Sequence, residues 1–219
     1  MPSISLEEEP TTSGSISMSH NANFPIILAS QSPRRRELLA GAGYRFIITP
    51  PAESAESGVY RGESSEAMVA RLARQKAFDV ARRTDNGIVL GCDTVAECSG
   101  EILGKPRDVE HARYMLRLLQ GKQHRVSSGL CLWEAGTSRH AVEVAVTRLI
   151  MEPLTDERID DYLASGQWQG KAGAFGYQDG HDWLRILEGS ASNVVGLPLE
   201  LLREMLDRMF RHHRCGARR

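Results

Sequence analysis

The chain has 219 residues and a formal net charge of -1, from 27 Lys and Arg against 28 Asp and Glu. Hydrophobic residues make up 41% and charged residues 25% of it, which excludes whole-chain disorder, collagen-like repeats and coiled coil. The balanced charge removes the general electrostatic argument for binding nucleic acid or an anionic membrane. The apolar runs fall far short of the roughly 20 residues of a membrane span. The composition therefore predicts a soluble globular protein.

The two ends of the chain differ in composition from the rest. Residues 1–23 are polar and acidic and lack the basic and apolar regions of a secretory signal, so we expect a disordered tail there. We place one folded domain over residues 24–210 and a basic C-terminal tail over residues 211–219. The four cysteines lie far apart without CxxC spacing, which argues against a zinc site or a disulfide framework and favours the cytoplasm.

Between these tails, short apolar runs alternate with amphipathic segments, which predicts a mixed, twisted α/β sheet with flanking helices. A second lobe over about residues 94–165 would leave a cleft between lobes. In chain order we expect a strand at 26–30, a helix from Pro33 to Gly41 or Gly43, a loop at 50–62, a helix from Ser64 or Ser65 to about Arg83, a strand at 88–92 that ends at Asp93, a helix at 108–120, strands at about 125–133 and 141–149, a helix between Thr155 and Gly166, a strand at 183–187 and a last helix from Pro198.

The first strand-to-helix turn, ASQSPRRR from residue 29, combines hydroxyls with arginines at a helix N-terminus. We expect the Ser32 hydroxyl to cap the helix and Pro33 to occupy its first position. Free N–H groups and guanidinium groups favour a phosphate at such a place. The alternative is a capped helix with solvated arginines. Walker and GxGxxG signatures are absent, which disfavours P-loop and Rossmann chemistry.

Three further positions are chemically suggestive. Lys76 falls within the apolar stripe of its helix, so its ammonium either reaches water along the packed stem or meets an anion. Asp93 ends an apolar strand at the edge where α/β sheets hold ligands, or simply makes a turn. Lys105 lies in a stiff Gly-Lys-Pro turn and is either solvated or part of a site.

The glycine-rich segment KAGAFGYQ from residue 171 lets the backbone come close to a ligand or to a packed neighbour. The histidines show neither HxH nor HExxH spacing, so a structural metal is not indicated.

Taken together, ILASQSPRRRELL, RLARQKA, LGCDTV, GEILGKPRD, KAGAFGYQ and EGSASNVVGLPLELL resemble, in this order, the Maf family of nucleoside triphosphate pyrophosphatases. The resemblance covers about residues 25–208. It implies an elongated, two-lobed Maf/ITPase-like fold with a central cleft, and a Mg²⁺ or Mn²⁺ cofactor. It also implies hydrolysis of the bond between the α and β phosphates, which yields a nucleoside monophosphate and pyrophosphate.

The resemblance also assigns roles to single residues. It implies phosphate contacts for Ser30, Arg34 and Arg35, a general base at Asp93 that also binds the metal, and charge stabilisation by two lysines. Those lysines are Lys76 and Lys105. Thr94 and Gln178 are expected near the nucleotide base of the substrate. A triphosphate with about four negative charges needs several cations and a metal, which agrees with this set.

Two departures from the family pattern affect this assignment. Many relatives read REKA where this chain has Arg74-Gln75-Lys76, and their acidic stretch aligns to Glu53 or Glu56 only with a gap. Both glutamates therefore stay candidates for the metal or water ligand. The loop after Gln178 is one residue shorter than in the family.

The LGCDTV and KAGAFGYQ forms resemble the subgroup that acts on dTTP and UTP. A Gln amide offers both a donor and an acceptor, which suits uracil and thymine. The rival function is a nucleotide-binding regulator of cell division without turnover, which the intact Asp93, Lys76 and Lys105 disfavour. A homodimer is implied by the resemblance alone.

Overall fold

The structure is a computed structural model that describes residues 25–58 and 60–216, with side chains described as far as residue 211. The predicted tail over residues 1–23 lies outside the described residues, as do residues 217–219. Within the part that is described, no helix combines the length and the apolar character needed to cross a membrane.

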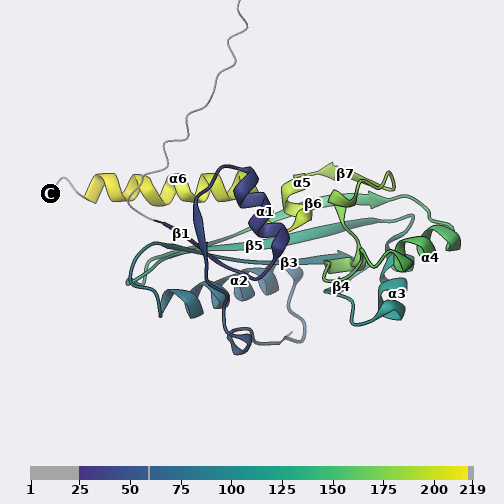
Figure 1. The fold of residues 1–219 in the computed structure, drawn as a ribbon, viewed down its shortest axis with the longest axis horizontal. Coiled ribbons are helices and arrows are strands. Elements are labelled where there is room, and N and C mark those ends of the chain that lie inside the picture. The colour runs from purple at the N-terminus through teal and green to yellow at the C-terminus, as the bar shows by residue number, and fades with distance from the viewer. Residues whose placement is uncertain (1–24, 59, 217–219) are drawn as a thin grey trace, which may run out of the picture.

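One mixed sheet runs along the molecule, as the sequence predicts (Figure 1). Its strand order is β2-β1-β3-β5-β6-β7, with β4 paired to β3 beside this path. The pairings of β1 with β2 and with β3 are parallel, and the other pairings are antiparallel. The strands are β1 (Ile26–Ala29), β2 (Phe46–Ile48), β3 (Ile88–Cys98), β4 (Glu101–Leu103), β5 (Gln123–Glu134), β6 (His140–Met151) and β7 (Leu184–Glu188).

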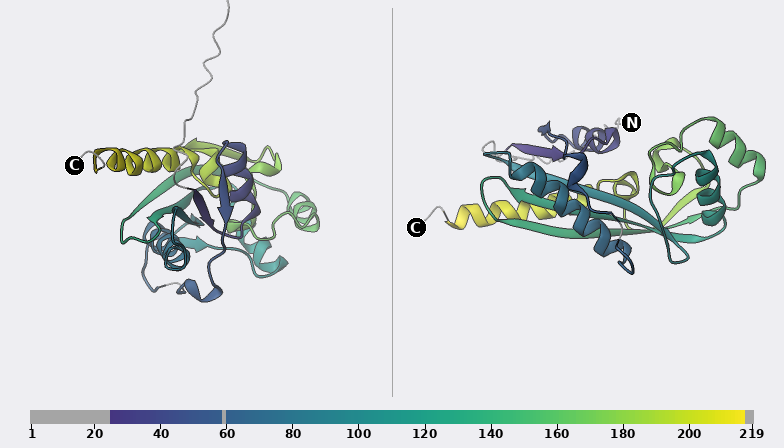
Figure 2. Two further views of the ribbon diagram at one scale, coloured as in Figure 1. Left: turned by 60° about the vertical axis from the view of Figure 1, so that its left-hand side comes forward. Right: turned by 90° about the horizontal axis from the view of Figure 1, so that it is seen from below.

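Helices cover both faces of the sheet. In Figure 1, α1 and α6 lie above it and α2 below it, while Figure 2 shows α3 and α4 gathered at the end far from the C-terminus. The helices are α1 (Pro33–Gly41), α2 (Ser65–Ala81), α3 (Val109–Leu119), α4 (Asp156–Ala164), α5 (Ala191–Val195) and α6 (Leu199–Gly216), with 3-10 turns at η1 (Glu53–Ala55), η2 (Ala172–Ala174) and η3 (Tyr177–Asp179).

Helix α2 packs very closely on the sheet because two strand glycines leave room for it. A Cβ at Gly91 would stand 2.2 Å from the Ala73 carbonyl oxygen, and one at Gly129 would stand 2.2 Å from that of Val69. The helix begins after Ser64, whose hydroxyl accepts the Ala67 N–H and so caps it. The close packing at Gly91 and Gly129 fixes which face of α2 turns toward the sheet.

The hydrophobic core divides into parts that match two lobes. One part gathers β1, α1 and α6 around buried residues such as Leu28 and Leu202, and another lies between α2 and the opposite face of the sheet. A separate cluster packs α3 and α4 on the far end of the long strands. This cluster also contains Phe175 and Trp183, beyond the predicted lobe end at 165, because β7 pairs with β6 and brings the preceding loop with it.

Several local predictions need correction. Strand β3 does not end at Asp93 but continues to Cys98, because β5 and β4 pair with that extension. The 50–62 loop contains the short turn η1. Helix α6 extends to Gly216, past residue 210, and the short elements β2, β4 and α5 are additions to the predicted set.

Candidate functional site

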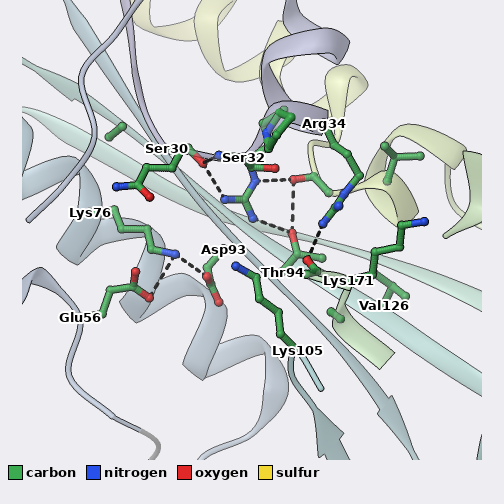
Figure 3. A pocket seen from close by; sticks show the side chains of 18 of the residues that line it. Ser30, Ser32, Arg34, Glu56, Lys76, Asp93, Thr94, Lys105, Val126 and Lys171 are labelled. Atoms are coloured by element: carbon green, nitrogen blue, oxygen red, sulfur yellow. Dashed lines mark hydrogen bonds and ion pairs between the residues drawn. The ribbon is translucent and has the colours of Figure 1, made fainter. Parts of the chain in front are cut away.

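A cavity of about 540 Å³ opens between the lobes, at the carboxyl end of β1 (Figure 3). Strand β1 stops with Ala29 opposite Gly91, whereas its neighbour β3 continues, so residues 93 and 94 are left beside an open edge. The wall is completed by the turn before α1, the η1 loop, the η2–η3 segment and the end of α5. The site residues predicted from the sequence all line it: Ser30, Arg34, Arg35, Glu53, Glu56, Lys76, Asp93, Thr94, Lys105 and Gln178.

The turn between β1 and α1 uses its hydroxyls differently from the prediction. The Ser32 side chain makes no capping hydrogen bond, although Pro33 does lie in the first turn of α1. Instead, the buried Ser30 hydroxyl accepts the Ser32 N–H at 3.2 Å. The prediction of a Ser32 cap was therefore wrong, because Ser30 organises the turn from one residue before it.

Both predicted arginines are tied to distant backbone. Arg35 donates from Nε to the Gly196 carbonyl at 2.9 Å and from Nη1 to the Ser30 hydroxyl at 3.2 Å. Arg34 donates from Nη2 to the Gly170 carbonyl at 2.8 Å, and burial together with the charge of Arg35 lowers its pKa. The two guanidinium groups are therefore fixed at the cavity wall, and the alternative of freely solvated arginines is wrong.

Lys76 meets anions. Its side chain is 10% exposed, and its Nζ lies 2.6 Å from Asp93 Oδ1 and 3.2 Å from Glu56 Oε2. The stem packs along the α2 face with the buried Val69 and Val80, as the periodicity predicts. Snorkelling to the outer surface is excluded, because the ammonium emerges into the cavity between two carboxylates (Figure 3).

Asp93 lies within β3, opposite Gly129 of β5. Its side chain is only 14% exposed and points toward the cavity beyond the end of β1. The turn alternative is therefore wrong, since the backbone on both sides of Asp93 is sheet. A carboxylate in mid-strand is exposed to the cavity here only because β1 is short.

Lys105 reaches the same cavity from the opposite lobe (Figure 3). Across the described residues its ammonium has no ion pair, unlike that of Lys76. Burial and the charges of Arg35 and Lys76 lower the pKa of Lys105. Positive charge thus accumulates at this end of the cavity with little compensation from the protein.

The two candidate glutamates differ in position. Both are exposed, but Glu56 contacts Lys76 and so lies beside Asp93, while Glu53 lies on η1 at the cavity rim. Within the ranges that the structure describes there is no group of three or more His, Cys, Asp or Glu side chains that could by itself enclose a metal. Asp93 and Glu56 nevertheless converge on one ammonium, and Mg²⁺ commonly takes only one or two protein carboxylates, with phosphate and water completing its shell. The donor set therefore fits a metal that is shared with a phosphate ligand.

Thr94 and Gln178 occupy different environments. The Thr94 hydroxyl lies 2.8 Å from that of Ser128 and accepts from Arg35 Nη2 at 3.3 Å, so the protein already engages it. Gln178 is exposed on η3 and lines the cavity from the other lobe. Its amide makes no hydrogen bond to any residue that the structure describes, so it stays available to a ligand.

Two supporting groups were missed by the sequence reasoning. Arg71 pairs with Glu63 at 2.6 Å and donates to the Ser57 hydroxyl at 2.7 Å, which holds the loop that carries Glu56. Lys171 pairs with Asp179 in the η2–η3 segment. For Arg71 the signal was its position in the same helix as Lys76, five residues before it. For Lys171 it was a lysine within a glycine-rich segment.

Comparison with known proteins finds similar chains by sequence and by structure. The sequence model of a family described as Maf-like protein matches residues 25–209. A dTTP/UTP pyrophosphatase of Rhodopirellula baltica is 54% identical over 183 residues, which cover 83% of this chain and 81% of that protein. A dTTP/UTP pyrophosphatase of Geotalea uraniireducens is 43% identical over 84% of this chain and 94% of its own. Among solved structures, a HAM1 protein from Coxiella burnetii aligns at a TM-score of 0.43 and 16% identity, over 84% of this chain and 99% of that one.

Proposed function

The chain belongs to the Maf-like family, and from this premise we propose that it is a nucleoside triphosphate pyrophosphatase that acts on dTTP and UTP. The observation that carries the proposal is the convergence of four predicted cationic side chains and three predicted carboxylates on one cavity. Among the described residues, Lys76 is the only one of these four cations that pairs with carboxylates in the cavity, so a polyanion is the ligand that the charge distribution favours. The identity of the relatives supports the nucleotide class.

In the proposed reaction, water attacks the α-phosphorus, the bond to the bridging oxygen breaks, and pyrophosphate leaves. Asp93 accepts the proton of the attacking water. Lys76 and Lys105 stabilise the negative charge that moves onto the phosphate oxygens, which is where fixed cations accelerate such a reaction. Lys76 also orients the Asp93 carboxylate through the 2.6 Å contact.

Substrate binding divides between the two sides of the cavity. Ser30, Arg34 and Arg35 hold phosphates at the α1 end, where the positive helix terminus adds to their charge. Thr94 and Gln178 flank the nucleotide base. The free amide of Gln178 can donate to a uracil or thymine carbonyl and accept from the ring N–H.

A Mg²⁺ or Mn²⁺ ion would be held by Asp93 and Glu56, with Glu53 as the alternative to Glu56. When bound, it neutralises phosphate charge and makes bound water more acidic.

The direct test exposes the purified full chain to dTTP, UTP and other nucleoside triphosphates with either metal and identifies the products. The expected products are nucleoside monophosphate and pyrophosphate. Orthophosphate and a diphosphate would show that a different bond is cut.

The binding-only regulator is not favoured, since the curated relatives reported above are named as pyrophosphatases. Absence of turnover on every nucleotide would favour the regulator instead. Cytoplasmic location, assembly as a homodimer and the absence of nucleic-acid binding stay predictions. Size-exclusion chromatography with light scattering tests the homodimer.

A further inference from the structure

A second charged cluster adjoins the wall of the cavity that carries Gln178, and one of its members, Lys171, is part of that wall. Lys171 Nζ pairs with Asp179 Oδ2, and the Tyr162 hydroxyl of α4 donates to the same oxygen at 3.2 Å. The Lys171 and Asp179 side chains are each 10% exposed. The ammonium of Lys171 points away from the cavity in Figure 3, unlike that of Lys105.

The backbone is shaped around this ion pair. A Cβ at Gly176 would stand 2.3 Å from Asp179 Oδ2 and 2.5 Å from Lys171 Nζ, so only glycine lets the pair close against the chain. The pair joins the first residue of the segment to its last turn and so closes a loop over residues 171–179. Gln178 lies in that last turn, directly before Asp179.

Tyr162 anchors the closed loop to the rest of the lobe. Its ring is buried and packs edge-on against Trp183 at a centroid distance of 5.1 Å. Burial and the charge of Asp179 raise the pKa of Tyr162, so its hydroxyl remains a donor at any physiological pH. At the other end of the loop, Arg34 holds the Gly170 carbonyl.

We propose that Asp179 is a positioning residue for base recognition: with Lys171 and Tyr162 it fixes the turn that presents the Gln178 amide to the nucleotide base. The inference deepens the proposed function and rests on it. It also argues against a phosphate-binding role for Lys171, although this residue lines the cavity, because Asp179 already neutralises its charge. A buried ion pair costs desolvation energy, and it can fix the geometry of the segment that carries it.

The test measures equilibrium binding of two probes to the full chain by calorimetry. One probe is the α,β-methylene analogue of UTP, which cannot be cleaved at the proposed bond, and the other is inorganic tripolyphosphate, which has no base. Asp179→Asn should weaken binding of the UTP analogue about five- to tenfold, the effect of one or two neutral hydrogen bonds, and should not weaken binding of tripolyphosphate, because the substitution removes a negative charge. Gly176→Ala forces the pair apart with every charge intact and should give the same pattern.

The matched control is Asp182→Asn. Asp182 lies three residues further along, and its carboxylate accepts from Arg158 at 2.6 Å, but its side chain is 83% exposed and does not touch the closed loop. This variant should bind both probes like the wild type. In steady-state kinetics with UTP, Asp179→Asn should raise KM while kcat changes little.

Three results would overturn the inference. Equal weakening of both probes would show that the pair supports phosphate binding and not base recognition. Unchanged binding of the UTP analogue by Asp179→Asn and by Gly176→Ala would leave the pair a purely structural contact. The same loss in Asp182→Asn would point to general loop stability. Since binding is measured without cleavage, failure of wild-type turnover would refute the proposed function separately.

Discussion

Lys76 is the residue at which removal of one charge should affect both stability and catalysis. The variant is Lys76→Met, since methionine keeps most of the packed stem beside Val69 and Val80 and removes the ammonium. The sequence alone predicts only a higher KM. The 2.6 Å contact with Asp93, whose side chain is 14% exposed, adds a cost in folding because the carboxylate loses its partner.

The magnitude follows from that contact. A hydrogen bond between charged groups contributes about 1.5 to 3 kcal/mol. For a chain of this size about 1 kcal/mol corresponds to roughly 2 to 4 °C in Tm, so the variant should melt about 3 to 12 °C below the wild type. If the same ammonium also contacts phosphate in the transition state, kcat/KM should fall by roughly 10- to 150-fold.

Lys105→Met is the matched control, because Lys105 lines the same cavity without an ion pair to any described residue. Its charge is repelled by Arg35 and Lys76, so its removal should leave Tm unchanged or slightly raised while kcat/KM still falls. Calorimetric melts and steady-state kinetics with UTP separate the two effects. A wild-type Tm in Lys76→Met would refute the stability argument, and an unchanged kcat/KM would refute its contact with phosphate.

The other predictions concern three separate groups. Asp93→Asn should lower kcat about 100-fold or more in a pyrophosphate-release assay, and a near wild-type rate would exclude it as the base. Burial lowers the pKa of His124 to about 4 from its ordinary 6.5. Between these two pH values the unfolded chain binds a proton that the folded chain does not bind, so the free energy of unfolding falls as the pH drops from 6.5 to 4, by at most about 3 kcal/mol. His124→Leu should lack this part of the acid sensitivity in melts from pH 7 to pH 4; parallel curves for the two proteins would contradict the argument. Arg71→Met should raise the Mg²⁺ concentration needed for half-maximal activity, because the Glu56 loop loses its clamp; an unchanged metal requirement would show that the clamp is not needed.

Most of the fold that could be predicted from the sequence was predicted from the periodicity of apolar residues along the helices. The α2 stripe of Val69, Leu72 and Val80 is buried as expected, since a helix face is set by local spacing. Short elements lack such a signal. Strand β2 has three residues and forms through pairing with β1, and α5 has five residues behind the Ser190 cap.

The chemistry of the site was predictable to a different degree. The residue types that line the cavity could be named, because hydroxyls, arginines and lysines in those motifs suit phosphate. The protein groups to which these side chains hydrogen-bond could not be named from the sequence. Arg35 donates to Gly196, which is 161 residues away, and only the packed fold brings them together. For the same reason the sequence left Glu53 and Glu56 equivalent, whereas Glu56 alone contacts Lys76.

The continuous strands beneath the cavity also limit how the molecule can move. Strands β3 and β5 pair without interruption from Ile88 opposite Glu134 to Glu97 opposite Arg125, so one hydrogen-bonded ladder passes under both lobes. A hinge at the cleft would have to break that ladder, unlike the single flexible linker of a two-domain enzyme. Any closure over the substrate must therefore come from the rim segment around η1, while the sheet under the cavity and the loop over residues 171–179 stay fixed. The two lobes should likewise melt in one transition, and neither half should fold when expressed alone.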